Sequence, residues 1–219
     1  MNLKLRKVVL LALLGVMVLT SSCNLDVNQE EDTLPILGER EEVNGETIYH
    51  EIPDFTFVNQ DSQLVNNATF EDKIYIADFF FTHCPTICPK MTKQMKRVHD
   101  QYLDNPDVAF ISHSIDVKND TVARLKWYAE SIGVNSSDKW HFVTGDKDEI
   151  YEIAEDYFSI ALEDDGVAGG FDHSGRLILI DKARRIRSFA DGTNPEEVDR
   201  LMKDMDKLLE EYQPATSGD

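Results

Sequence analysis

Two cysteines separated by three residues form the segment of this sequence best suited to chemistry. Residues 79–91 read FFFTHCPTICPKM, in which Cys84 and Cys88 follow an apolar run and precede apolar residues at helical spacing. This pattern predicts a dithiol at the N-terminal turn of a helix, where unpaired N–H groups and the helix dipole lower thiol pKa values. Thiolates attack disulfides and bind soft metal ions, so the pair has two chemical uses.

The number of sulfur ligands narrows the choice of metal. Thioredoxin-type oxidoreductases have two residues between their cysteines and this chain has three, but both spacings permit a disulfide or a bridging metal. Two thiolates suit Cu(I), and an added imidazole also permits Cu(II). A four-thiolate zinc site is excluded because the chain has only three cysteines. A structural disulfide is the alternative in which the pair has no reactive role.

The third metal ligand is predicted from the positions of the histidines. His83 is next to Cys84, but adjacent side chains at the end of a strand diverge. His173 lies in the Gly-rich segment GGFDHS, directly before a predicted strand at residues 176–180. In a thioredoxin-like sheet the loop that enters the penultimate strand lies beside the dithiol. We therefore predict His173 as the third ligand.

Alternating strand and helix patterns surround these residues. The apolar, β-forming segments predict strands at residues 74–81, 108–112, 176–180 and 186–189, and a small hairpin within 55–65. Helical periodicity begins after Cys88, after 119–120, near 150 and at Pro195, which follows the N-cap candidate Asn194. The chain is therefore predicted to form an α/β domain with a mixed central sheet flanked by helices.

The first 23 residues have the features of an export signal. Basic residues precede an apolar run at 8–19, and small residues followed by Cys23 come after it. The run is shorter than the ~20 residues that a spanning helix needs. It resembles a bacterial lipoprotein signal, in which the cysteine is lipidated; a plain secretory signal is the alternative. We predict a signal peptide at 1–22, an acidic tether at 23–47, a folded domain at 48–212 and a disordered tail at 213–219.

The charge balance limits the partners of the protein. The 219 residues include 22 Lys and Arg against 41 Asp and Glu, a formal charge of −19. An acidic surface repels phosphate backbones, so nucleic-acid binding is not expected. A lipidated Cys23 would hold the protein on a bacterial membrane in the cell envelope, facing the periplasm or the exterior. Dithiols oxidise there unless a reductant acts on them.

The cysteine segment, together with residues 110–116 and the DHS sequence at 172–174, resembles the Sco/SenC family of copper chaperones. The similarity extends over about residues 49–209. It implies a thioredoxin-like fold, attachment to a membrane and a role in assembling the copper site of cytochrome c oxidase. It also implies a copper site, for Cu(I) or Cu(II), formed by the redox dithiol of Cys84 and Cys88 and by His173.

The resemblance implies a metallochaperone rather than an enzyme. Its partners would be the copper-site subunit of cytochrome c oxidase and a thioredoxin-like reductant. Many family members carry Asp where this chain has Thr86. A thiol-disulfide reductase acting on exported proteins is the main alternative, because the same thiolate serves that chemistry. A peroxiredoxin, which needs threonine where Phe81 stands, and a redox or copper sensor are further alternatives.

Overall fold

The computed structural model describes residues 33–163, 166 and 170–213. The predicted signal peptide, the predicted lipidation residue Cys23 and residues 214–219 of the predicted tail lie outside this range. No helix of the described ranges is both long enough and apolar enough to cross a membrane.

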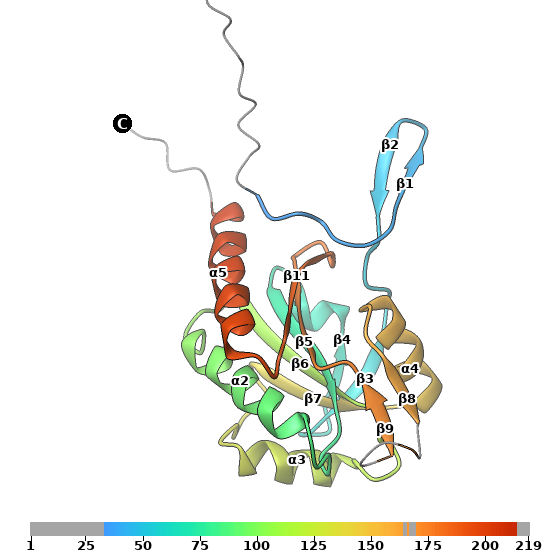
Figure 1. The fold of residues 1–219 in the computed structure, drawn as a ribbon, viewed down its shortest axis with the longest axis vertical. Coiled ribbons are helices and arrows are strands. Elements are labelled where there is room, and N and C mark those ends of the chain that lie inside the picture. The colour runs from blue at the N-terminus through green and yellow to red at the C-terminus, as the bar shows by residue number, and fades with distance from the viewer. Residues whose placement is uncertain (1–32, 164–165, 167–169, 214–219) are drawn as a thin grey trace, which may run out of the picture. The chain divides into compact units, whose positions relative to one another are not determined.

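A seven-stranded mixed sheet in the order β11-β10-β5-β6-β7-β3-β4 forms the centre of the domain (Figure 1). Its strands are β3 (Thr56–Asn59), β4 (Leu64–Asn66), β5 (Ile74–Phe80), β6 (Val108–Ser114), β7 (Trp140–Thr144), β10 (Arg176–Ile180) and β11 (Ile186–Asp191). The helices are the 3-10 helix η1 (Asn67–Phe70) and the α-helices α2 (Cys88–Gln101), α3 (Val122–Ser131), α4 (Lys147–Asp156) and α5 (Pro195–Glu211). Strands β5, β6 and β7 are parallel and the other pairs are antiparallel. The predicted mixed sheet is confirmed; β7 was not among the predicted strands.

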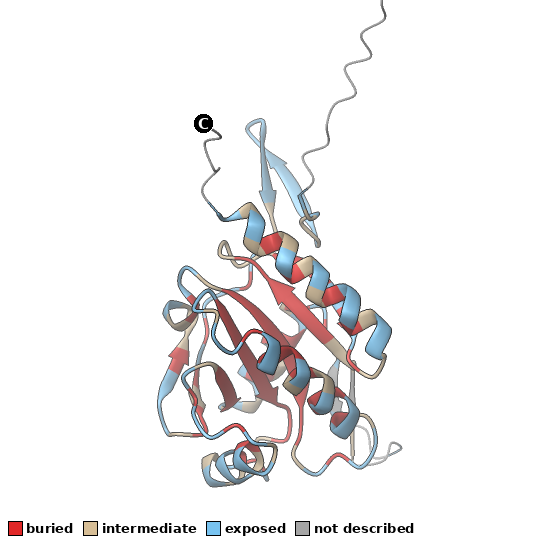
Figure 2. Ribbon diagram, turned by 90° about the vertical axis from the view of Figure 1, so that its left-hand side faces the viewer, coloured by how far each residue is buried: buried red, intermediate tan, exposed pale blue. Residues whose placement is uncertain are grey.

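Alternate residues of β5 pack on opposite sides of the sheet, and the whole strand is buried (Figure 2). On one side, Tyr75 OH lies 3.0 Å from the hydroxyl of Tyr157, which follows α4. On the other side, Phe80 packs against Tyr128 of α3. Right-handed crossovers between neighbouring parallel strands place their helices on one face. Accordingly α2 and α3 lie together, with 2.8 Å between Thr92 Oγ1 and Tyr128 OH.

The C-terminal helix begins where the sequence predicts. The Asn194 side chain accepts a hydrogen bond from the Glu196 N–H, and Pro195 occupies the first helical position. The buried residues of this helix recur three and four positions apart and cover the sheet near β10 and β11. The N-cap of α3 is Thr121, directly after the segment 119–120 where the helical periodicity was predicted to begin, and Asp120 has another role described below.

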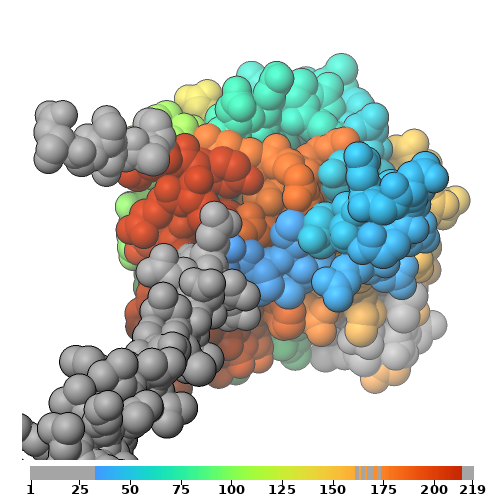
Figure 3. Space-filling model, turned by 90° about the horizontal axis from the view of Figure 1, so that it is seen from above, coloured from blue at the N-terminus to red at the C-terminus, as the bar shows by residue number. Residues whose placement is uncertain are grey.

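A β-hairpin replaces part of the predicted tether. Strands β1 (Arg40–Val43) and β2 (Glu46–Tyr49) pair antiparallel and project from the top of the domain in Figure 1. Asn44 and Gly45 both have positive φ, as the two-residue turns that suit a twisted hairpin require. The Leu37 N–H donates to the Ile186 carbonyl at 2.8 Å, and Figure 3 shows this segment in blue beside the orange C-terminal strands. The chain therefore joins the domain before residue 40, not at residue 48 as predicted.

Two further short strands, β8 (Ala161–Glu163) and β9 (Phe171–His173), form a separate antiparallel pair. They lie between α4 and β10 in the sequence. The prediction placed His173 in a loop; the structure places it at the end of β9, three residues before β10 begins.

Candidate metal centre

The two thiols lie where β5 gives way to α2. Cys84 is in the connecting loop, Cys88 is the first residue of the helix and Pro89 follows it, as predicted. The Cys84 residue is 8% exposed and Cys88 is 1% exposed. Both are reduced thiols. The pair thus lies at the surface of the core, between the C-terminal end of the apolar strand β5 and a helix whose second residue is proline.

The two thiols differ in acidity. Burial opposes ionisation of Cys84, but hydrogen bonds from the Thr86 and Cys88 groups outweigh it and lower the Cys84 pKa. One of these contacts joins Cys84 Sγ to Thr86 Oγ1 at 3.6 Å. Burial, with the neighbouring Cys84 and Asp78, raises the Cys88 pKa. Cys84 is therefore the more acidic thiol of the pair, and Cys88 keeps its proton until a metal or a new disulfide bond replaces it.

A buried carboxyl group lies beneath the dithiol. Asp78 of β5 is 2% exposed, and its Oδ1 atom has no hydrogen-bond partner among the described residues. Burial raises its pKa to about 7, although a hydrogen bond with Ser112 acts in the opposite direction. Its negative charge also raises the pKa of Cys88. This buried carboxyl group was not predicted from the sequence, in which a single Asp inside an apolar strand was the available signal.

The raised pKa of Asp78 predicts a pH-dependent loss of stability. Because this pKa is about 7 in the folded state and 3.8 in the reference state, the contribution of the group to stability is full below pH 3.8 and is lost as the pH rises towards 7. Asp78→Asn is therefore expected to raise the free energy of unfolding at about pH 8 by ~2–4 kcal/mol. Urea unfolding at several pH values measures the gain.

The matched control for this prediction is Asp104→Asn, at an exposed position. It should change stability by less than ~0.5 kcal/mol. If Asp78→Asn raised the free energy of unfolding equally at about pH 4, the raised pKa of Asp78 would not be the cause, since Asp78 is protonated in the folded state at that pH.

A second polar cluster fixes the loop that carries Cys84. Asp120 accepts hydrogen bonds from the Thr82 N–H at 2.9 Å and from the Ser114 hydroxyl at 2.6 Å. His83 Nε2 lies 3.3 Å from Asp116 Oδ2. The ligand atoms of His83, Asp116 and Asp120 lie within 4.8 Å of one another, close enough to share a cation. The carboxylate oxygens already accept hydrogen bonds from the protein, so this cluster orders the loop and directs the imidazole of His83 to Asp116.

The backbone of His173 lies close to the dithiol. Strand β10 runs antiparallel to β5 with Ile178 opposite Ala77, so residues that precede β10 lie beside the end of β5. The rings of Phe171 and Phe81 confirm this, with centroids 5.0 Å apart. The structure describes the backbone of His173 and not its side chain, so its contact with the sulfur atoms stays a prediction.

The residues after His173 also border the dithiol turn. Ile87, which directly precedes Cys88, lines one cavity of about 360 Å³ together with Ser174 and Gly175. A Cβ atom on Gly175 would lie 3.6 Å from Ile87 Cδ1. The structure thus brings together Cys84, Cys88 and the backbone that carries His173 from opposite ends of the domain sequence.

Comparisons with known proteins identify the family of this chain. The SCO1/SenC family profile matches residues 44–210. The SCO1 protein homolog of Bacillus subtilis is 31% identical over 158 residues, which cover 71% of this chain and 81% of that protein.

Two solved structures have the same fold. BsSco, described as a member of the Sco family of cytochrome c oxidase assembly proteins with a disulfide switch, matches with a TM-score of 0.64 and 31% identity over 73% of this chain and 93% of its own. Arabidopsis thaliana ScoI with copper bound matches with a TM-score of 0.61 and 25% identity over 73% and 98%. These matches confirm the predicted thioredoxin-like fold, and with the profile match they show that the chain belongs to the SCO1/SenC family.

Proposed function

We propose that this protein binds copper through Cys84, Cys88 and His173 and delivers it during assembly of the copper site of cytochrome c oxidase. The observation that carries the proposal is the pairing of two reduced thiols of unequal acidity beside the backbone of His173. Thiolates are soft ligands that suit Cu(I), and an imidazole adds affinity for Cu(II). The copper-bound Arabidopsis relative and the oxidase-assembly role of BsSco support the same function.

The acidity difference suits the loading and release of a metal ion. Cys84, whose pKa is lowered, ionises more readily than Cys88 and is the first ligand to engage copper. Cys88 loses its proton only when the metal replaces it, so copper binding should release a proton. Because the pair lies at the edge of a groove, an incoming ligand from a partner can reach the metal before an old one leaves.

Copper titration of the reduced protein tests the proposal. We expect one copper per chain, and a sulfur-to-copper charge-transfer band with Cu(II). Prior oxidation of Cys84 and Cys88 to a disulfide should abolish both signals, because it removes the thiolate ligands. Equal binding by the oxidised protein would rule out the dithiol as the copper site.

We also propose that Cys23 is lipidated and holds the protein on a bacterial membrane, facing the periplasm or the exterior. Support comes from the basic start, the short apolar run and the small residues before Cys23. Incorporation of labelled palmitate should be lost in Cys23→Ser, and that variant should leave the membrane fraction. Unchanged membrane attachment of Cys23→Ser would refute a lipid anchor at this residue.

Thiol-disulfide reduction is a second candidate function, and the lowered pKa of Cys84 favours it. A thiolate at Cys84 can attack a partner disulfide, after which Cys88 attacks the mixed disulfide and releases the reduced partner. Turnover of a disulfide substrate that survives loss of His173 would support this role. Copper binding that needs His173, without turnover, would support copper delivery alone.

A further inference from the structure

Charge is unevenly distributed over the helices of this acidic protein. Helix α2 has four Lys and Arg residues against one Asp, and α3 has two against one Glu. Helix α4 has one Lys against five acidic residues, and α5 has three basic against seven acidic residues. Helices α2 and α3 are therefore the two net-positive α-helices in the described part of the chain. The formal charge of the full sequence is −19. Helices α2 and α3 are also the helices next to the dithiol.

A groove of about 360 Å³ lies between α2 and α3 and reaches both thiols. Cys84 and Cys88 line it, Thr92 and Tyr128 lie along its length, and its lining is mostly apolar. Figure 1 shows α2 and α3 as neighbouring helices in the lower left part of the view. An extended polypeptide segment placed in this groove would run past the sulfur atoms.

Lysines form the α2 side of this groove. Lys93 and Lys96 both line it. Lys96 is paired with Asp100 at 2.6 Å, whereas Lys93 is exposed and has no ion-pair partner within the residues that the structure describes. The positive charge of Lys93 is therefore available to a ligand in the groove.

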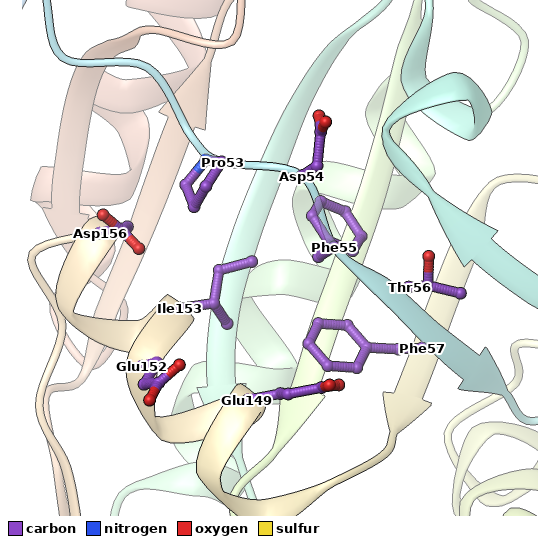
Figure 4. Close-up of a pocket in the computed structure, with 9 residues that line it drawn as sticks. All are labelled: Pro53, Asp54, Phe55, Thr56, Phe57, Glu149, Glu152, Ile153 and Asp156. Atoms are coloured by element: carbon purple, nitrogen blue, oxygen red, sulfur yellow. The ribbon is translucent and has the colours of Figure 1, made fainter.

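A second hollow is lined by acidic instead of basic side chains. Its volume is about 550 Å³, and it lies beside α4, lined by Asp54, Glu149, Glu152 and Asp156 around the rings of Phe55 and Phe57 (Figure 4). No cysteine lines it. An acidic segment would be repelled from this hollow and attracted to the groove beside the thiols.

We infer that the groove between α2 and α3 is the docking site for an acidic, extended, cysteine-bearing segment of the partner protein. The inference rests on the proposed function, because it assumes that Cys84 exchanges copper or a disulfide bond with another protein. Apolar residues of the segment would cover the groove, its acidic residues would pair with the α2 lysines, and its cysteine would meet Cys84. Complementary charge of this kind mainly raises the rate of encounter.

A pair of peptides tests the inference through one defined reaction. The peptides are identical except for four Glu or four Lys residues, and each carries one cysteine in a disulfide with thionitrobenzoate. The Cys84 thiolate attacks the peptide sulfur, a new disulfide forms, and the thionitrobenzoate anion leaves with the bonding electrons and is measured by absorbance. Rates with neutral dithiothreitol correct for the intrinsic reactivity of each peptide.

The groove and the overall charge predict opposite results. A protein of charge −19 should favour the Lys peptide if only its net charge acts. The groove predicts that the Glu peptide reacts ~3–10-fold faster at low ionic strength, with the preference lost at about 0.5 M salt. A parent protein that favours the Lys peptide overturns the inference.

Three variants test whether Lys93 causes the preference for the Glu peptide. Lys93→Glu should abolish or reverse the preference for the Glu peptide, and Lys93→Arg should keep it. Lys203→Glu, at an exposed position of α5, changes the net charge equally and should also keep it. Equal losses in Lys93→Glu and Lys203→Glu would overturn the docking site.

Copper titration of the parent separates this inference from the proposed function. A parent that binds copper but shows no preference for the Glu peptide refutes the groove alone. A parent that shows the preference without binding copper refutes copper delivery and leaves the groove as the docking site of a reductase.

Discussion

Replacing Cys88 with serine is expected to abolish stoichiometric copper binding while leaving a fast-reacting thiol at position 84. Loss of an outer-shell partner already lowers metal affinity ~10–100-fold, so loss of one of two thiolate ligands should lower copper affinity by more than ~100-fold. Cys84→Ser should lower it as strongly. The two variants should thus be equivalent in copper titrations.

The same two variants should differ in thiol reactivity. The remaining thiol of Cys88→Ser is Cys84, whose pKa is lowered by hydrogen bonds such as the Thr86 contact, so its thiolate fraction is raised. The remaining thiol of Cys84→Ser is Cys88, which is 1% exposed and whose pKa burial raises. Each unit of pKa changes the thiolate fraction about tenfold, and the higher nucleophilicity of a more basic thiolate offsets part of this. We expect Cys84 to react at least ~100-fold faster.

Stopped-flow reaction of each variant with a disulfide reagent at neutral pH measures this difference. Denatured samples provide the control, because both thiols should react at similar rates once burial and the Thr86 contact are lost. Equal rates in the folded variants would contradict the conclusion that Cys84 is the more acidic thiol of the pair.

The site could be predicted from the sequence where it depends on neighbours along the chain. An apolar strand, a CxxxCP segment and a helix at the following residues placed Cys84 and Cys88 at the start of α2. The position of His173 needed the order of the sheet, which the expectation of a thioredoxin-like sheet supplied. The pairing of β10 with β5 now brings its backbone to the dithiol.

Features that depend on distant contacts were missed. Asp78 looked like one residue of an apolar strand, and only the packing of α2 on β5 makes it a buried carboxyl group beside Cys88. His99 of α2 is buried against Phe110 and Trp140, two contacts that its neighbours in the sequence do not reveal. The hairpin of β1 and β2 was missed because its strands are exposed and carry no apolar alternation, although Asn44-Gly45 was a local turn signal.

Replacing His173 with alanine is expected to separate the two oxidation states of copper. Two thiolates suffice for Cu(I), so its affinity should fall less than ~10-fold. Cu(II) prefers a nitrogen ligand as well, so its affinity should fall more than ~100-fold and the charge-transfer band should be lost or displaced. Competition titrations with chelators, followed by absorbance, measure both effects.

His83→Ala is the matched control for this prediction, since His83 is adjacent to Cys84 in sequence but its imidazole contacts Asp116. It should leave the Cu(II) spectrum unchanged and alter Cu(II) affinity less than ~3-fold, because the loop is also held by the hydrogen bonds between Thr82 and Asp120. If His173→Ala binds Cu(II) as tightly as the parent with unchanged absorption, His173 is not a ligand. If His83→Ala loses the band instead, the imidazole next to Cys84 completes the site, and the loop must release His83 from Asp116 when copper binds.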